Sequence, residues 1–206
     1  MIPRLIGGAG FAGVGKDTLG DALVQGLGYV KFSFSDALYL EVSAAFDIPI
    51  EYLRDREHKE RKTDLLGLRR CRDHGFVGRM MTGVGQEFRA AQSPRDILQW
   101  WGTEYRREQD PDYWVKRARD FYHQQLEAGA PGLVNCSVRF VNEAQWILAE
   151  GGAVVRIQRP GVGAVNAHVS DKPLPAEYVT AEIVNDGRPE DLLGKLLKAL
   201  ETAEAA

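Results

Sequence analysis

Apolar residues form short runs and helical stripes that alternate along the chain. Runs typical of buried strands occupy residues 2–7, 29–34, 133–136, 153–157 and 179–184. Apolar residues recur every three or four positions over segments of helical length. These segments are residues 16–26, 35–46, 93–105, 113–126, 140–150 and 189–203. Strands that alternate with helices predict an α/β fold of three layers, with a mainly parallel sheet and helices on both faces.

The most informative segment lies between the first predicted strand and the first predicted helix. It reads GFAGVGKDT over residues 10–18, which matches the phosphate-binding spacing G-x-x-x-x-G-K. Glycines let backbone N–H groups turn toward an anion, and the following helix adds the positive end of its dipole. We therefore predict a P-loop that binds nucleotide phosphates through Gly10, Gly13, Val14, Gly15, Lys16, Asp17 and Thr18.

The residue after the lysine departs from this pattern. Asp17 stands where a Ser or Thr is expected to place a hydroxyl on magnesium, and Thr18 follows it. A carboxylate in the first helical turn gains roughly 0.3–1 kcal/mol from the helix dipole. We expect Asp17 and Thr18 to serve Mg²⁺, unless Asp17 faces the acceptor substrate. The alternative is a glycine turn that starts an ordinary helix, in a chain with 22 glycines.

Composition places few limits on function. The 206 residues suit one domain, residues 1–206, with a helical insertion over about residues 34–110. A net charge of −3 makes nucleic acid an unexpected partner, and no apolar stretch is long enough to span a bilayer. We expect a cytoplasmic protein in which Cys71 and Cys136 are reduced thiols. Cys71 and His74 form only half of a zinc ligand set.

The segment 57–79 is strongly charged and weakly periodic. Its composition favours a solvated helix and loop. A basic flap that closes over phosphates is the functional alternative, and DNA binding through this segment is another.

The remaining polar residues favour a kinase over a hydrolytic motor or a GTPase. The predicted strand at 133–136 ends in Asn135, Cys136 and Ser137, without the carboxylate of a hydrolytic ATPase, and the chain has no N-K-x-D segment. Arginines follow several predicted elements instead: Arg106, Arg107, Arg139 and Arg159. Transfer to a phosphate acceptor needs such cations, because donor and acceptor repel each other.

Four segments in chain order resemble the deoxynucleoside monophosphate kinases of tailed bacteriophages, a P-loop kinase family. They are GVGKDT at 13–18, FSDAL at 34–38, LQWWGTE at 98–104 with Arg106 and DYWV at 112–115, and SVRFVNEA at 137–144 continuing to Pro160. Weaker likenesses lie at 168–171 and 185–187. The family usually has D-V-R-F where this chain has Ser137-Val138-Arg139-Phe140, so one expected magnesium or acceptor contact is missing.

The resemblance implies transfer of the ATP γ-phosphate to a deoxynucleoside monophosphate, with Mg²⁺ and a possible homodimer. It implies that Lys16 holds the donor phosphates and Arg139 stabilises the transferring group. The acceptor pocket is implied to contain Asp36, Gln99, Trp101, Thr103, Glu104 and Arg106. Trp100 is the alternative to Trp101 for stacking on the base, since neighbours on a helix point about 100° apart.

Two other functions fit the same residues. One is another small-molecule P-loop kinase, of the dephospho-coenzyme A or phosphomevalonate kinase type. The other is a nucleotide-binding regulatory protein without turnover, which Ser137 favours.

Overall fold

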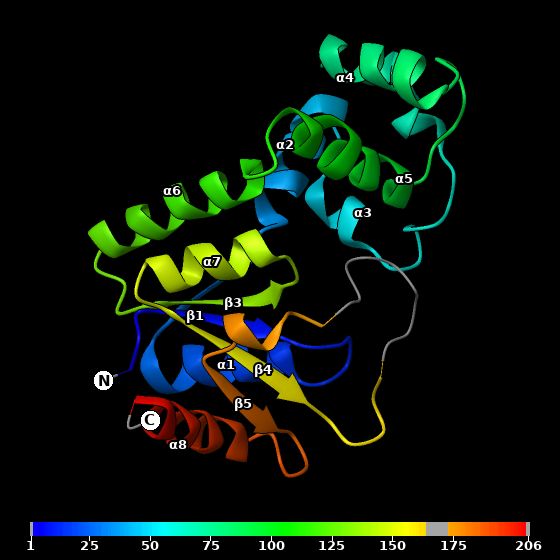
Figure 1. Ribbon diagram of the computed structural model, residues 1–206. Helices are drawn as coiled ribbons and strands as arrows, with labels where there is room; N and C mark the ends of the chain where they lie inside the picture. Colours follow the sequence, from blue (N-terminus) through cyan, green and yellow to red (C-terminus); the bar gives the residue numbers. More distant parts are fainter. Residues whose placement is uncertain (1, 164–172, 205–206) are drawn as a thin grey trace. The chain divides into compact units, whose positions relative to one another are not determined.

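The computed structural model describes residues 2–163 and 173–204, so the weak motif at 168–171 lies outside the described residues. The chain divides into two compact units (Figure 1). The first unit comprises residues 1–34 and 118–206, and the second comprises residues 35–117. Each unit has an apolar core of its own.

Among the described residues, five parallel strands form the sheet of the first unit, in the order β2-β3-β1-β4-β5. The strands are β1 (Leu5–Ala9), β2 (Val30–Phe32), β3 (Leu133–Val138), β4 (Ala153–Gln158) and β5 (Ala181–Val184). All five residues of β1, the central strand, are buried. Parallel strands covered on both faces read as continuous apolar runs, which is why the sequence pattern identifies them.

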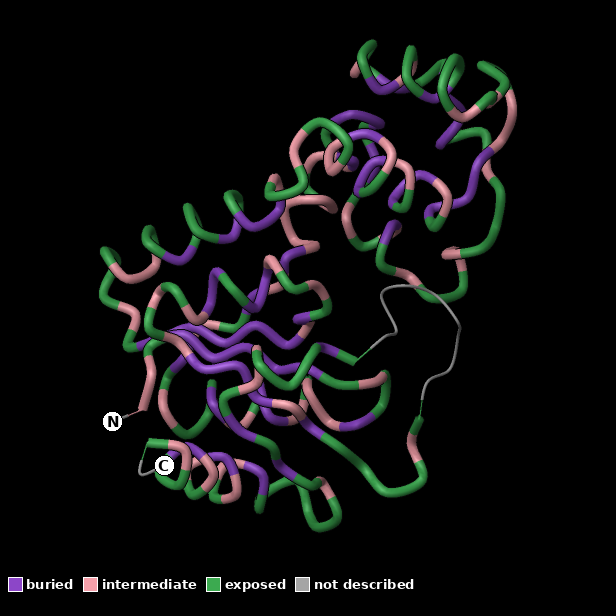
Figure 2. Tube along the Cα trace, in the orientation of Figure 1, coloured by how far each residue is buried: buried purple, intermediate pink, exposed green. Residues whose placement is uncertain are grey.

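Helices cover both faces of this sheet and make three layers (Figure 1). On one face lie α1 (Lys16–Leu27) and α8 (Asp191–Glu204), which contact each other. On the other face lie α7 (Val141–Ala149) and the part of α6 (Tyr113–Glu127) that belongs to this unit. The strands β1, β3 and β4 are buried along most of their length (Figure 2). The predicted α/β class with helices on both faces of a parallel sheet is confirmed.

The first strand begins later and runs further than the predicted 2–7. Because β1 ends at Ala9, Gly8 and Ala9 lie in the strand with Gly7 and not in the loop. A Cβ on Gly7 would lie 2.5 Å from Cδ1 of Ile147 on α7 and 2.8 Å from Cγ2 of Val138. Glycine therefore allows α7 to approach the sheet closely.

The second unit is helical. Its elements are α2 (Asp36–Phe46), α3 (Ile50–Arg54), η1 (Asp64–Leu66), η2 (Leu68–Arg70), α4 (His74–Arg79), η3 (Met80–Val84), α5 (Pro94–Gln99) and η4 (Trp100–Arg107). Ser93 and Asp96 form a capping box that starts α5. The predicted helix at 93–105 continues beyond α5 as η4, which has the wider turns of a π-helix.

The charged segment 57–79 differs from the solvated helix and loop that its composition favours. It contains η1, η2 and α4, and it buries Leu66, Leu68 and Phe76 completely. These three side chains belong to the core of the second unit. The segment is thus anchored at intervals by apolar residues that its many charges obscure in the sequence.

One carboxylate organises the core of the second unit. Glu41 on α2 accepts hydrogen bonds from Trp101 Nε1 at 2.9 Å, Arg106 Nε at 2.9 Å and the Tyr113 hydroxyl at 2.5 Å. The Arg106 guanidinium also lies 4.6 Å from the ring centroid of Tyr105 and 5.0 Å from that of Tyr113. Burial lowers the pKa of Arg106, but the hydrogen bond and charge of Glu41 outweigh it and the net shift is upward. The guanidinium therefore stays charged among the rings of Trp101, Tyr105 and Tyr113.

Both cysteines are free and buried, and they form no disulfide in the described structure. Burial raises the pKa of Cys71 and of Cys136 to about 11. Cys136 Sγ lies against α1, where a Cβ on Gly20 would be 2.3 Å from it. Within residues 2–163 and 173–204, no helix has the length and apolar character needed to cross a bilayer.

Removal of the Glu41 carboxylate should strongly destabilise the protein, because a largely buried guanidinium would lose its partner. We expect Glu41→Ala to lower the free energy of unfolding by about 3 kcal/mol, measured by urea denaturation at pH 7. The matched control is Glu60→Ala, which removes the partner of Arg95 in a pair whose side chains are 54% and 66% exposed. That control should lose less than about 1 kcal/mol. Equal losses in the two variants would contradict the organising role of Glu41.

The two thiols should react slowly with thiol reagents in the folded protein. A pKa of about 11 leaves the thiolate a minor species at pH 8, roughly one part in 10³. Labelling by a disulfide reagent should therefore be slow at pH 8 and should become fast in urea. Rapid labelling of either thiol without denaturant would show that this thiol is not buried and that its pKa is not raised.

Candidate functional site

The predicted phosphate-binding loop joins β1 directly to α1 at the carboxyl end of the central strand. Gly10, Gly13 and Gly15 have φ angles of 137°, 80° and 107°. Residues with a side chain adopt such angles only with strain. Because α1 begins at Lys16, its unpaired N–H groups and its positive dipole end lie at the loop. The local geometry is therefore suited to an anion.

Lys16 is held inside the loop by the loop's own backbone. Its Nζ donates to the carbonyl oxygens of Gly10 at 2.8 Å and Phe11 at 2.7 Å. Burial lowers the pKa of Lys16, and the nearby charge of Arg139 lowers it further. The two residues predicted to be catalytic thus lie close enough to interact electrostatically.

Arg139 follows β3, and its backbone is fixed by α7. Glu143, a buried residue of α7, accepts hydrogen bonds at Oε2 from the N–H groups of Arg139 at 2.9 Å and Phe140 at 3.1 Å. The Arg139 residue itself is exposed. Its position is therefore set by a carboxylate that the sequence analysis did not single out.

Two cavities of the first unit share the loop. The strand-end cavity has a volume of about 420 Å³, and its walls include Gly10, Phe11, Arg139 and Arg156. The helix-start cavity has a volume of about 280 Å³, and its walls include Gly13, Asp17, Thr18 and Asn185. Lys16 and Arg159 line both cavities. Two cationic side chains therefore form part of the wall of each cavity.

Asp17 and Thr18 occupy the first turn of α1, as predicted, and both line the helix-start cavity. Asp17 also pairs with Lys31 of β2 at 3.2 Å, and Lys31 contacts Asp21 at 3.0 Å. In the described part of the chain, no group of three or more His, Cys, Asp or Glu residues is placed to hold a metal. Magnesium on a nucleotide needs only one or two protein oxygens, and this turn offers a hydroxyl and a carboxylate.

Ser137, which replaces the carboxylate of the resembled family, belongs to a small polar network. Its Oγ donates to Asn135 Oδ1 at 3.0 Å and lies 2.8 Å from Ser33 Oγ. Asn135 is fully buried. The ends of β2 and β3 are therefore linked by neutral groups at this position.

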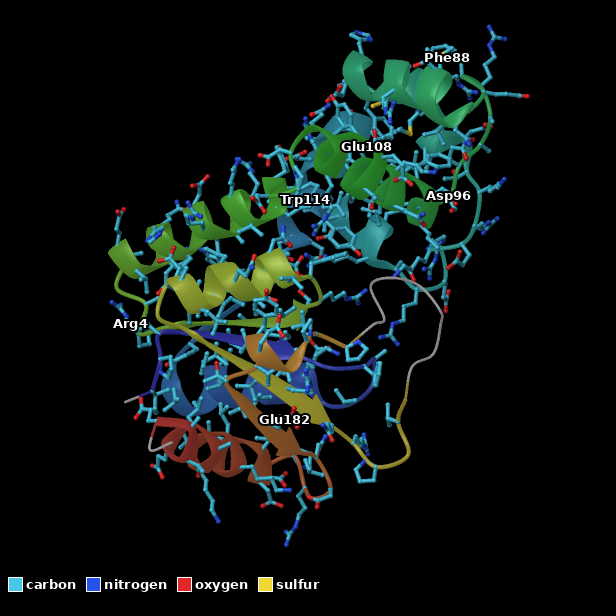
Figure 3. All side chains as sticks on the ribbon, in the orientation of Figure 1. Arg4, Phe88, Asp96, Glu108, Trp114 and Glu182 are labelled. Carbon is cyan, nitrogen blue, oxygen red and sulfur yellow. The ribbon has the colours of Figure 1, made fainter. Side chains whose placement is uncertain are left out.

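Most of the predicted acceptor residues lie on or next to η4 in the second unit. Gln99 and Thr103 are exposed. Arg79 holds the same turn, since its Nε donates to the Glu104 carbonyl at 3.2 Å and its guanidinium pairs with Glu108. Figure 3 labels Glu108, which directly follows η4. Among the described residues, Glu104 Oε2 is a buried atom without a hydrogen-bond partner.

Asp36 begins α2 and is not isolated. Arg54 donates to Asp36 Oδ1 at 2.7 Å, and its guanidinium lies 4.9 Å from the ring centroid of Tyr39. Arg54 comes from α3, and the sequence offered no periodicity or motif that would have connected it with Asp36. The cluster adds a cation to the predicted acceptor residues.

The predicted contact of Trp101 with a base needs a correction. The residue is 1% exposed and packs against Phe76, with 4.6 Å between ring centroids, while its Nε1 donates to Glu41. This burial argues against the predicted contact of Trp101 with a base. Trp100 is partly exposed, so it is the better placed of the two tryptophans for stacking. Arg106 is also bound within the core, by Glu41 and the aromatic rings around it.

Two curated viral proteins are similar to this chain. A putative deoxynucleotide monophosphate kinase of Acanthamoeba polyphaga mimivirus is 24% identical over 209 residues, which cover 97% of each protein. The deoxynucleotide monophosphate kinase of Escherichia phage RB69 is 31% identical over 91 residues, which cover 44% of this chain and 37% of the phage protein. No family model matches the chain.

Two solved structures align with nearly the whole chain. TT1252 from Thermus thermophilus superposes with a TM-score of 0.50 at 18% identity, covering 98% of both chains. An unliganded sugar kinase from Janibacter sp. HTCC2649 gives a TM-score of 0.44 at 14% identity, covering 98% of this chain and 97% of that one. The viral relatives confirm the motif-based prediction: the chain is an enzyme of the kinase class and resembles the deoxynucleotide monophosphate kinases of viruses and bacteriophages.

Proposed function

We propose that this protein transfers the γ-phosphate of ATP to a deoxynucleoside monophosphate, giving ADP and a deoxynucleoside diphosphate. The observation that carries the proposal is the glycine loop at the end of β1, with Lys16 and Arg159 shared by the two cavities beside it. The names of the two viral relatives support the choice of acceptor.

The first unit is assigned the donor. The N–H groups of the loop and the start of α1 hold the β- and γ-phosphates. Lys16 leaves its carbonyl partners, Gly10 and Phe11, to contact the same oxygens. The helix-start cavity, bounded by Gly13, Gly15 and Asn185, is the space assigned to the rest of the nucleotide.

Catalysis in this proposal is mainly positioning and charge cancellation. An oxygen of the acceptor phosphate forms a bond to the γ-phosphorus while the bond between that phosphorus and the oxygen of ADP breaks. Negative charge on the equatorial oxygens is balanced by Lys16, Arg139 and Arg159, so no strong general base is required. Arg159 joins the two predicted catalytic cations because it lines both cavities.

The first turn of α1 fits a phosphate-bound Mg²⁺. Thr18 would hold it through its hydroxyl, and Asp17 would hold it through water while keeping its pair with Lys31. When bound, the ion neutralises charge on the donor phosphates. The neutral Ser137 leaves this role to the residues of α1.

The second unit is assigned the acceptor. Asp36 with Arg54 offers a paired carboxylate and cation, Gln99 and Thr103 offer exposed polar groups, and Trp100 offers a surface for stacking. Glu104 is partly exposed, and a carboxylate suits an N–H donor on a base. Arg106 is given a positioning role through Glu41 in place of direct contact with the acceptor.

A nucleotide-binding protein without turnover is the second candidate function. The Ser137 network favours it, because a hydroxyl bonded to Asn135 replaces a carboxylate. Such a protein would bind ATP and form no ADP with any acceptor.

A kinase of the dephospho-coenzyme A or phosphomevalonate type would instead use another acceptor. The viral relatives suit an enzyme of the host cytoplasm, and the homodimer stays a prediction.

A panel of acceptors tests the proposal. The protein is incubated with ATP, Mg²⁺ and each common ribo- and deoxyribonucleoside monophosphate, together with dephospho-coenzyme A and phosphomevalonate. We expect ADP formation that depends on at least one deoxynucleoside monophosphate. Turnover with one of the other small acceptors alone would refute the acceptor class, and ATP binding without turnover would favour the regulatory alternative.

Replacement of Lys16 tests the donor site. Lys16→Ala should lower kcat by about a hundredfold, by analogy with the loss of one preorganised donor to a transition state. The matched control is Lys198→Ala, an exposed lysine of α8 outside both cavities, which should leave kcat unchanged. Near-normal activity of Lys16→Ala would remove the loop from the mechanism.

A further inference from the structure

Asn185 connects the end of β5 to the phosphate-binding loop. Its Nδ2 donates to the carbonyl oxygen of Val14 at 2.8 Å, across 171 positions of sequence. Its backbone N–H donates to the Gln158 carbonyl at 2.8 Å and so continues the pairing of β4 with β5. The side chain therefore starts from a backbone position that the sheet fixes.

Glycine at position 15 is matched to this side chain. A Cβ on Gly15 would lie 2.3 Å from Asn185 Nδ2, so any side chain at position 15 would displace this amide. Gly15 also has a φ of 107°. The third glycine of the loop is therefore required by its backbone angle and by the amide that lies against it.

The contact fixes the direction of one loop N–H group. In a trans peptide the carbonyl of one residue and the N–H of the next lie in one plane and point in opposite directions. The described chain has no cis peptide. Because Asn185 holds the Val14 carbonyl, the Gly15 N–H must point away from Asn185. One side-chain hydrogen bond thus orients a potential donor to phosphate.

The turn that carries Asn185 is held from α8. Lys195 donates to the Val184 carbonyl at 2.9 Å and pairs with Asp186. Asp191 Oδ2 accepts a hydrogen bond from the Arg188 N–H at 3.1 Å. These contacts, on both sides of Asn185, limit how far its amide can move from Val14.

We propose that Asn185 is a positioning residue of the phosphate site: it orients the Gly15 N–H toward the bound phosphates. The inference rests on the proposed function, since it assigns the anion to the loop. It predicts that phosphate affinity depends on the donor capacity of a residue that need not touch the phosphate.

Titration calorimetry of the full chain with inorganic tripolyphosphate tests this role. Asn185→Ala removes the donor, and Asn185→Asp keeps the size but places a carboxylate beside the Val14 carbonyl. We expect the affinity for tripolyphosphate to fall about tenfold in Asn185→Ala and further in Asn185→Asp. Glycine-selective ¹⁵N spectra should show a Gly15 amide that shifts on titration of the wild type and shifts less in the variants.

The matched control is Glu190→Gln, a change at an exposed position near the same turn that lies outside the helix-start cavity. It should keep wild-type affinity, and all variants should unfold within a few degrees of the wild type. Equal loss in Glu190→Gln, or wild-type affinity and an unchanged Gly15 shift in both Asn185 variants, would overturn the inference alone. A wild-type protein that binds neither tripolyphosphate nor ATP would overturn the proposed function as well.

Discussion

The pairing of β1 with both β3 and β4 is the constraint on which the site depends. A central, fully buried strand must leave the sheet at its carboxyl end, and here it turns at once into α1. Leu19 and Leu23 pack that helix against the sheet, and these residues are only 1% and 0% exposed. The loop between two such fixed elements has little freedom, so its glycine angles are set by the core. Rigid support of this kind is what an anion site needs to hold its donors in place.

Charge at the site follows from the same arrangement. Lys16, Arg139 and Arg159 come from three different segments, and the ends of β1, β3 and β4 bring them around one cavity. Parallel strands place their carboxyl ends at a common edge, where ligands of open α/β sheets bind. The acidic excess of the whole chain, −3, therefore says little about this edge. Asp17, the carboxylate that the P-loop pattern does not expect, is itself paired with a cation, Lys31.

Short-range patterns in the sequence predicted the features that short-range interactions determine. The apolar run, the glycine spacing and the helix that follows are encoded within 27 residues, and the structure has all three. Glu41 could not be found in this way, because its partners Trp101, Arg106 and Tyr113 lie 60 to 72 positions away. The burial of Trp101 was missed for the same reason. The sequence shows an aromatic residue near a motif, but its contact with the ring of Phe76 is made only in the fold. The end of the first strand was misplaced at Gly7 because the pairing of Gly8 and Ala9 with β4 is made only in the fold.

The two carbonyl partners of Lys16 have a consequence for how ligands are selected. Two of the three donors of this ammonium are already satisfied by carbonyl oxygens. A weak anion such as chloride offers little in exchange for those oxygens, whereas a polyphosphate offers several charged ones at once. The loop should thus discriminate between anions by charge density, and monovalent anions should compete weakly for Lys16.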